Sequence, residues 1–214
     1  TGSGKTRTSM EIITDVLRNN PEGSVVFWLA HSEELCEQAV QCFKEVWEHV
    51  GNKNIKIFRV WDKGSLAFTF SESAFMVGGF QKLHALLKKN KLPFDEIKNR
   101  IDLLVIDEAH KVLAPTYLEA TRALMGDNTK VIGLTATPGR HIDDLESNQL
   151  LSDFFLNKIV TITTADNKSV IQYLREKKVL SKATFDPLIT NINYELDDRQ
   201  KKHLETFYDF PDGL

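Results

Sequence analysis

Short apolar runs and longer amphipathic segments follow one another along the chain. The run SVVFWLA, residues 24–30, is continuous rather than alternating, which is typical of a parallel strand buried on both faces. Similar runs predict further core strands, and an alternating segment at residues 66–70 predicts a minor edge strand. The predicted core strands are residues 24–30, 55–61, 74–79, 101–107 and 130–136.

Between these runs, apolar residues recur at helical spacing. Ser32 is a good cap for one such helix, which we expect to extend to residue 50. Its apolar face would carry Leu35, Ala39, Phe43, Val46 and Val50. Further helices are predicted over residues 5–19, 80–89, 116–125 and 196–210. The alternation predicts an α/β fold: an open, mostly parallel β-sheet with helices on both faces, which binds ligands at the carboxyl ends of its strands.

Composition narrows the class of protein without naming its function. The chain has 214 residues and a net charge of −3, so it has no global basic surface, and any contact with nucleic acid must come from a local patch. No apolar run in the sequence is long enough to cross a membrane. Cys36 and Cys42 lie six residues apart on different faces of a predicted helix, which indicates reduced thiols. These features favour a cytoplasmic protein.

The first polar motif opens the chain. Gly2, Ser3, Gly4, Lys5 and Thr6 form the second half of a phosphate-binding loop, G-x-x-x-x-G-K-[ST], directly before a predicted helix. Backbone amides of such a loop point at phosphate oxygens, the lysine contacts the β- and γ-phosphates of ATP, and the threonine hydroxyl binds Mg²⁺. The first half of the loop would lie before residue 1. The ordinary alternative is a glycine-rich turn that happens to precede a helix.

The second motif follows the apolar run at residues 101–107. Asp107 stands where P-loop enzymes place the acid that holds Mg²⁺, and Glu108 would orient or deprotonate the attacking water. A solvated acidic turn at the end of a strand is the alternative. Zinc chemistry of the HEXXH type does not fit, because no second histidine follows His110 at helical spacing.

The third motif, LTATPGR at residues 134–140, ends the next predicted strand. Enough chain separates it from Asp107 for one crossover helix and a return strand. The hydroxyls of Thr135 and Thr137 would then bridge the nucleotide site to other parts of the molecule. Taken alone, the segment is also compatible with a simple Pro-Gly turn.

Together the three motifs resemble a known family. GSGKT, DEAH and TATPGR, in this order, are similar to motifs I, II and III of superfamily-2 helicases and translocases, most of all the type III restriction and excision-repair branch. AHSEELCEQA at residues 30–39 resembles motif Ia, and VGGFQKL at residues 77–83 resembles the segment around motif Ib. The resemblance implies a RecA-like first motor lobe that binds ATP and Mg²⁺.

The resemblance also assigns roles residue by residue. Lys5 and Thr6 would bind ATP–Mg²⁺, with Asp107 and Glu108 carrying out hydrolysis. Three further residues would couple hydrolysis to movement: His110, Thr135 and Thr137. The segments around motifs Ia and Ib would contact nucleic acid through His31, Gly78 and Gly79.

The resemblance divides the chain in two. Residues 1–150 would be the ATP-binding lobe, beginning inside motif I, and residues 151–214 the exit segment and linker toward a second RecA-like lobe. That lobe, which in this family carries an arginine finger, has no counterpart in the sequence. We therefore expect these residues alone to turn over ATP very slowly, as an excerpt of a larger motor that works with restriction or repair subunits.

Several functions remain open at this point. TATPGR and EELCEQA look less like the spliceosomal DEAH branch, which favours DNA over RNA as the nucleic-acid partner. An RNA helicase or RNA-sensing ATPase of the same superfamily is the closest alternative. A small-molecule P-loop kinase would give no reason for the threonine-rich third motif. A non-catalytic nucleotide-binding module would give no reason to retain Lys5, Thr6, Asp107 and Glu108 together.

Overall fold

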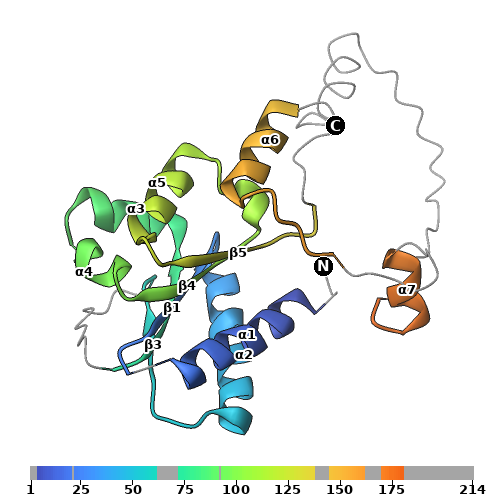
Figure 1. The fold of residues 1–214 in the computed structure, drawn as a ribbon, viewed down its shortest axis with the longest axis horizontal. Coiled ribbons are helices and arrows are strands. Elements are labelled where there is room, and N and C mark those ends of the chain that lie inside the picture. Colours follow the sequence, from blue (N-terminus) through green and yellow to red (C-terminus); the bar gives the residue numbers. More distant parts are fainter. Residues whose placement is uncertain are drawn as a thin grey trace, which may run out of the picture. The chain divides into compact units, whose positions relative to one another are not determined.

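The computed structural model describes residues 4–20, 22–61, 72–91, 93–137, 145–161 and 170–180 (Figure 1). The chain divides into two compact units, Thr1–Leu180 and Ser181–Leu214, and all described residues belong to the first. Its strands are β1 (Val25–Ala30), β2 (Lys56–Arg59), β3 (Ala74–Gly79), β4 (Ile101–Asp107) and β5 (Lys130–Leu134). Its helices are α1 (Lys5–Asn19), α2 (Glu33–Val50), α3 (Phe80–Lys88), α4 (Phe94–Lys98), η1 (Ala109–Lys111), α5 (Pro115–Leu124), α6 (Leu145–Phe154) and α7 (Val170–Glu176).

The strands form one parallel sheet in the order β2-β3-β1-β4-β5. Strands β1 and β3 are buried along their whole length, as their continuous apolar sequences predict. The register brings the carboxyl ends together: Ala30 lies opposite Gly79, Leu29 opposite Ile106, and Asp107 opposite Leu134. The predicted α/β fold is confirmed, and its motifs meet at one edge of the sheet.

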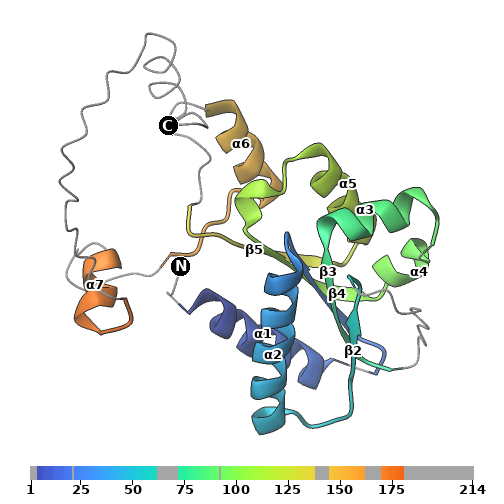
Figure 2. The ribbon, with the colours of Figure 1, turned by 180° about the vertical axis from the view of Figure 1, so that it is seen from behind.

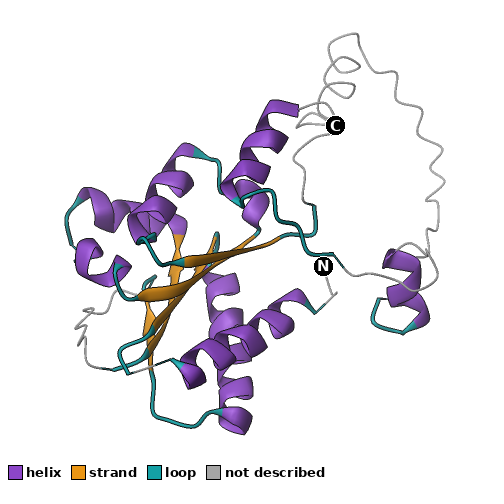
Figure 3. Cartoon of the chain, in the orientation of Figure 1, coloured by secondary structure: helices purple, strands orange, loops and turns teal. Residues whose placement is uncertain are grey.

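Helices cover both faces of the sheet (Figures 1, 2 and 3). On one face, α1 and α2 pack against alternate side chains of β1, among them Trp28, which is fully buried. On the other face, the intervening residues of β1, including Phe27, share a second core cluster with residues of α3, α4, α5 and α6. Trp28 is thus a core residue, as expected for a strand buried on both faces, and Trp47 and Trp61 are partly buried against the same cluster.

The structure differs from the sequence-based expectations at a few elements. The second strand, β2, is shorter than the apolar run at residues 55–61 and lies at the edge of the sheet, where it pairs only with β3. Val50, expected on the buried face of α2, is 38% exposed at the last position of the helix. Helices α4 and α7 were not predicted. The strand predicted at residues 66–70 and the helix predicted at residues 196–210 lie outside the described residues.

Candidate ATP-binding site

The amino end of α1 has the properties of an anion-binding helix terminus. Gly4 precedes the helix with φ 81° and ψ 9°, a left-handed conformation that glycine adopts without strain. It has no side chain to satisfy the amides of the first turn, and that turn carries no acidic residue. The positive end of the helix dipole therefore remains able to receive a negative group beside Lys5 and Thr6, both half-buried. Gly2 and Ser3 lie outside the described residues.

Asp107 ends β4, within electrostatic reach of Lys5. Its Oδ1 accepts a hydrogen bond from the Glu108 amide at 3.0 Å, which orients the carboxylate. Burial raises the pKa of the Asp107 carboxyl, and the nearby charge of Glu108 acts in the same direction. The amide hydrogen bond lowers that pKa in part, as do electrostatic interactions with the nearby His31 and Lys5 side chains. The structure thus brings the lysine of the first motif and the acid of the second motif into one electrostatic environment.

Glu108 turns the chain sharply out of the sheet. Its φ of 51° and ψ of 50° place a non-glycine residue in the left-handed region, which costs roughly 1–2 kcal/mol. Its carbonyl oxygen accepts a hydrogen bond from the Lys111 amide at 2.9 Å, within the short helix η1 that follows. After this turn, the Glu108 carboxylate lies 3.3 Å from His110 Nδ1.

His110 connects the second and third motifs. Its Nδ1 lies 3.3 Å from Glu108 Oε2 and 3.1 Å from Thr135 Oγ1. The Thr135 hydroxyl donates to the carbonyl oxygen of Thr137 at 2.9 Å and accepts from the Thr137 amide at 3.0 Å. Because the hydroxyl hydrogen is used in that way, Thr135 must accept from His110, and the imidazole carries a hydrogen on Nδ1. The residues predicted to couple the motifs are in direct contact.

The residues predicted to contact nucleic acid have different surroundings. A Cβ at Gly78 would lie 3.2 Å from each of Leu83 Cδ1, Phe27 Cε1 and Val60 Cβ, so core packing alone explains the glycine there. At Gly79 a Cβ would meet only the Ala30 carbonyl oxygen, at 4.0 Å. A nucleic-acid role for Gly78 and Gly79 stays a prediction. His31 lies one position beyond the end of β1, within electrostatic reach of Asp107.

Sequence reasoning missed one structural part of the site. Gly133 lies in β5, where a Cβ would come within 2.5 Å of Phe155 Cζ and 2.8 Å of Ala109 Cβ. The absence of a side chain at Gly133 therefore lets Ala109, in the turn after Asp107, and Phe155, directly after α6, pack against β5. A glycine inside an apolar strand signals a close approach of this kind, although it does not say which residues approach.

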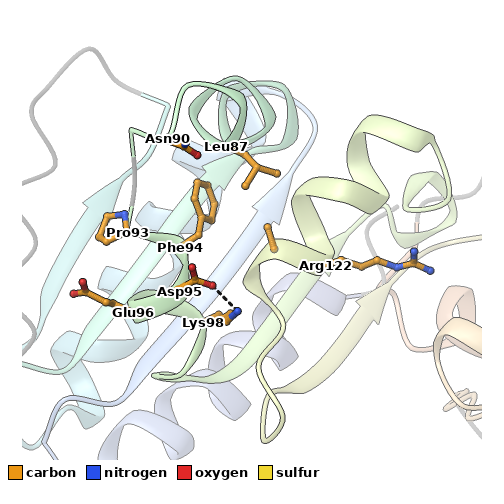
Figure 4. A pocket seen from close by; sticks show the side chains of 9 residues that line it. Leu87, Asn90, Pro93, Phe94, Asp95, Glu96, Lys98 and Arg122 are labelled. Atoms are coloured by element: carbon orange, nitrogen blue, oxygen red, sulfur yellow. Dashed lines mark hydrogen bonds and ion pairs between the residues drawn. The ribbon is translucent and has the colours of Figure 1, made fainter.

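One sizeable cavity among the described residues lies away from this site. It has a volume of about 500 Å³ and is lined by α3, α4 and α5, with an ion pair of 2.6 Å between Asp95 and Lys98 at its wall (Figure 4). None of the motif residues lines it. Among the described residues, no helix is long and apolar enough to cross a membrane.

The sequence matches known proteins over most of this lobe. Residues 1–140 match the family described as type III restriction enzyme, res subunit. The chain is 24% identical over 225 residues to the mouse Fanconi anemia group M protein homolog, covering 100% of the chain and 10% of that protein. It is 34% identical over 144 residues to the putative mitochondrial ATP-dependent helicase irc3 of Schizosaccharomyces pombe, covering 64% of the chain and 21% of that protein. The chain spans a tenth to a fifth of the length of these relatives.

Solved structures share the fold. The Pyrococcus furiosus Hef helicase domain aligns with a TM-score of 0.56 and 24% identity, covering 72% of this chain and 32% of that one. The S. cerevisiae Dbp5 structure bound to RNA and ADP BeF3 aligns with a TM-score of 0.56 and 18% identity, covering 77% of this chain and 40% of that one. These likenesses confirm the RecA-like architecture. With the match over residues 1–140, they lead to one conclusion: the chain belongs to the type III restriction enzyme res subunit family and contains the first RecA-like lobe of a superfamily-2 helicase of restriction and repair type.

Proposed function

We propose that the chain is the ATP-binding and ATP-hydrolysing lobe of a motor that moves on DNA. The observation that carries the proposal is the meeting of three motifs at the carboxyl edge of one sheet. Lys5 lies within electrostatic reach of Asp107, and His110 joins Glu108 to Thr135. A strained glutamate beside a half-buried acid costs stability, and a lobe with a purely structural role would gain nothing from that arrangement.

Lys5 and Thr6 are the residues that we assign to the nucleotide. The uncapped amides at the start of α1 and the Lys5 ammonium suit the phosphates of ATP, and the Thr6 hydroxyl suits a hard cation. The described residues contain no cluster of three or more His, Cys, Asp or Glu side chains that could form a metal site by itself. Thr6 and Asp107 would therefore hold Mg²⁺ only in company with the nucleotide, which is how Mg²⁺ is commonly bound in such enzymes.

Glu108 is the residue that we assign to the attacking water. When bound, Mg²⁺ neutralises charge that develops on the phosphates. The Glu108 carboxylate orients the water or accepts its proton, while its contact with His110 Nδ1 limits where the carboxylate can move. The hydrogen bond from His110 to Thr135 then links the position of Glu108 to β5. Movement of the third motif and hydrolysis are thereby coupled.

DNA as the polymer along which the motor moves is supported by the name of the matched family, a restriction enzyme subunit. RNA is the second candidate, and it is supported by the Dbp5 structure, which has RNA bound to it. The two candidates share the same ATP chemistry and differ only in the polymer that stimulates it.

The test is ATP turnover of the protein at its full natural length, measured in parallel with duplex DNA, single-stranded DNA and RNA. We expect DNA to stimulate turnover. Lys5→Ala should reduce turnover by about 10² or more with every polymer, because one amine serves both binding and charge stabilisation in the transition state. Stimulation by RNA alone would favour the second candidate, an RNA-dependent motor. Unchanged turnover of Lys5→Ala would refute the assignment of Lys5 to the nucleotide site.

A further inference from the structure

His31 occupies a position that its sequence motif does not explain. It follows Ala30, the last residue of β1, and the β1–β4 register pairs Leu29 with Ile106. Continuing that register by one residue sets Ala30 level with Asp107, so His31 lies just beyond the acid at the carboxyl edge of the sheet. The next residue, Ser32, caps α2 by accepting a hydrogen bond from the Leu35 amide at 3.3 Å. This cap fixes the backbone directly after His31.

The imidazole carries an unsatisfied polar atom. Nδ1 of His31 is buried and has no hydrogen-bond partner among the residues that the structure describes. A buried ring nitrogen without a partner costs free energy, so its presence in a folded protein calls for a specific explanation. Because Nδ1 is buried, a polymer approaching from solvent cannot reach this atom. Its environment is the Asp107 carboxyl, whose pKa the imidazole helps to lower.

We propose that His31 is a positioning residue of the ATP–metal site rather than a contact to nucleic acid. When nucleotide and metal fill the site, Nδ1 hydrogen bonds to the Asp107 carboxylate and holds it toward the metal. Partners of this kind commonly fix metal-binding carboxylates, and their loss weakens metal binding. The inference rests on the proposed function, since it requires that Asp107 binds a metal.

Two substitutions separate the ring nitrogens. In His31→Asn the amide nitrogen takes the place of Nδ1, whereas in His31→Gln it reaches toward the place of Nε2. His49→Gln is a matched control, because His49 is exposed at the opposite end of α2. In the full-length protein, Mn²⁺ affinity is measured by electron paramagnetic resonance with AMP-PNP present, and affinity for duplex DNA is measured by fluorescence anisotropy without nucleotide.

We expect His31→Gln to weaken Mn²⁺ binding by about 10–100-fold. His31→Asn and His49→Gln should keep the affinity of the unsubstituted protein, and all three should keep its DNA affinity. Rescue by asparagine distinguishes a specific hydrogen bond from a general packing effect, and thermal unfolding of each variant verifies that it is folded.

Two results would overturn the inference while leaving the proposed function intact. One is unchanged Mn²⁺ affinity in His31→Gln. The other is a loss of DNA affinity in both His31 variants with metal binding preserved, which would restore the nucleic-acid role. Failure of the unsubstituted protein to bind Mn²⁺ with AMP-PNP would instead refute the proposed function, and the inference with it.

Discussion

Gly133→Ala should destabilise the fold at the point where β5 meets the turn after Asp107. The added Cβ would lie 2.5 Å and 2.7 Å from two ring atoms of Phe155 and 2.8 Å from Ala109 Cβ. Ordinary carbon contacts need about 3.5–4.0 Å, so both neighbours must move by roughly 1 Å. Phe155 is a side chain that can rotate, whereas Ala109 moves only with its backbone.

Overpacking of this size costs about 1–3 kcal/mol. In a domain of this length each kcal/mol lowers the unfolding temperature by about 2–4 °C, so we expect a loss of about 2–12 °C. The assay is thermal unfolding followed by circular dichroism. Gly79→Ala is the matched control: it adds the same methyl group in the same sheet, but Gly79 has φ −88° and its Cβ would meet only one atom, at 4.0 Å. We expect this control to stay within about 0.5 kcal/mol.

Replacing Phe155 identifies the source of the strain. Phe155→Leu removes the two closest ring atoms, so Gly133→Ala should cost less in that background than in the unsubstituted chain, by about 0.5–3 kcal/mol. An unfolding temperature of Gly133→Ala equal to that of Gly79→Ala would refute the packing of α6 and Ala109 on β5. An equal cost of Gly133→Ala in both backgrounds would locate the strain at Ala109 alone.

Three further changes have defined outcomes. Thr135→Val removes the hydroxyl that accepts from His110, so stimulation of ATP turnover by DNA should fall about tenfold while ATP affinity, measured by calorimetry, is retained; full stimulation would contradict the coupling role. Asp107→Asn should increase the free energy of unfolding of the nucleotide-free protein at pH 7 by about 0.5–2 kcal/mol, and so raise its unfolding temperature. Burial raises the pKa of this carboxyl in the folded protein, so stability falls as the pH rises from the ordinary value of 3.8 through the raised value. Asparagine does not titrate and should abolish that part of the fall. A lower unfolding temperature of the variant at pH 7 would refute this reasoning. Ser32→Ala removes the cap of α2 and should lower stability by about 1 kcal/mol, measured by urea unfolding, with no change counting against the cap.

The central strands and the positions of the motif residues in the sheet could be predicted from the sequence because each depends on local information. The apolar runs of β1, β3 and β4 are long enough to identify buried strands, and the acids at the end of β4 follow its last apolar residue. The meeting of Lys5 with Asp107 follows from the rule that parallel strands present their carboxyl ends together.

Other features depend on information that a single sequence does not contain. Helix α4 has only five residues, too few to show helical periodicity. The contact of Phe155 with Gly133 joins segments whose packing no spacing rule determines. His31 is the clearest case: its motif suggested nucleic acid, and only the register of β1 against β4 sets it beside Asp107.

The most direct test of the proposed chemistry separates ATP binding from hydrolysis in Glu108→Gln. The measurement pairs ATP affinity by calorimetry with single-turnover hydrolysis, in the full-length protein with DNA and Mg²⁺. The amide retains the size of the side chain and leaves Lys5, Thr6 and Asp107 in place, so ATP affinity should match that of the unsubstituted protein. Hydrolysis should slow by about 10²–10⁴-fold, because the carboxylate that acts on water is lost. Hydrolysis at the unsubstituted rate, or loss of ATP binding together with hydrolysis, would contradict the division of labour between Asp107 and Glu108.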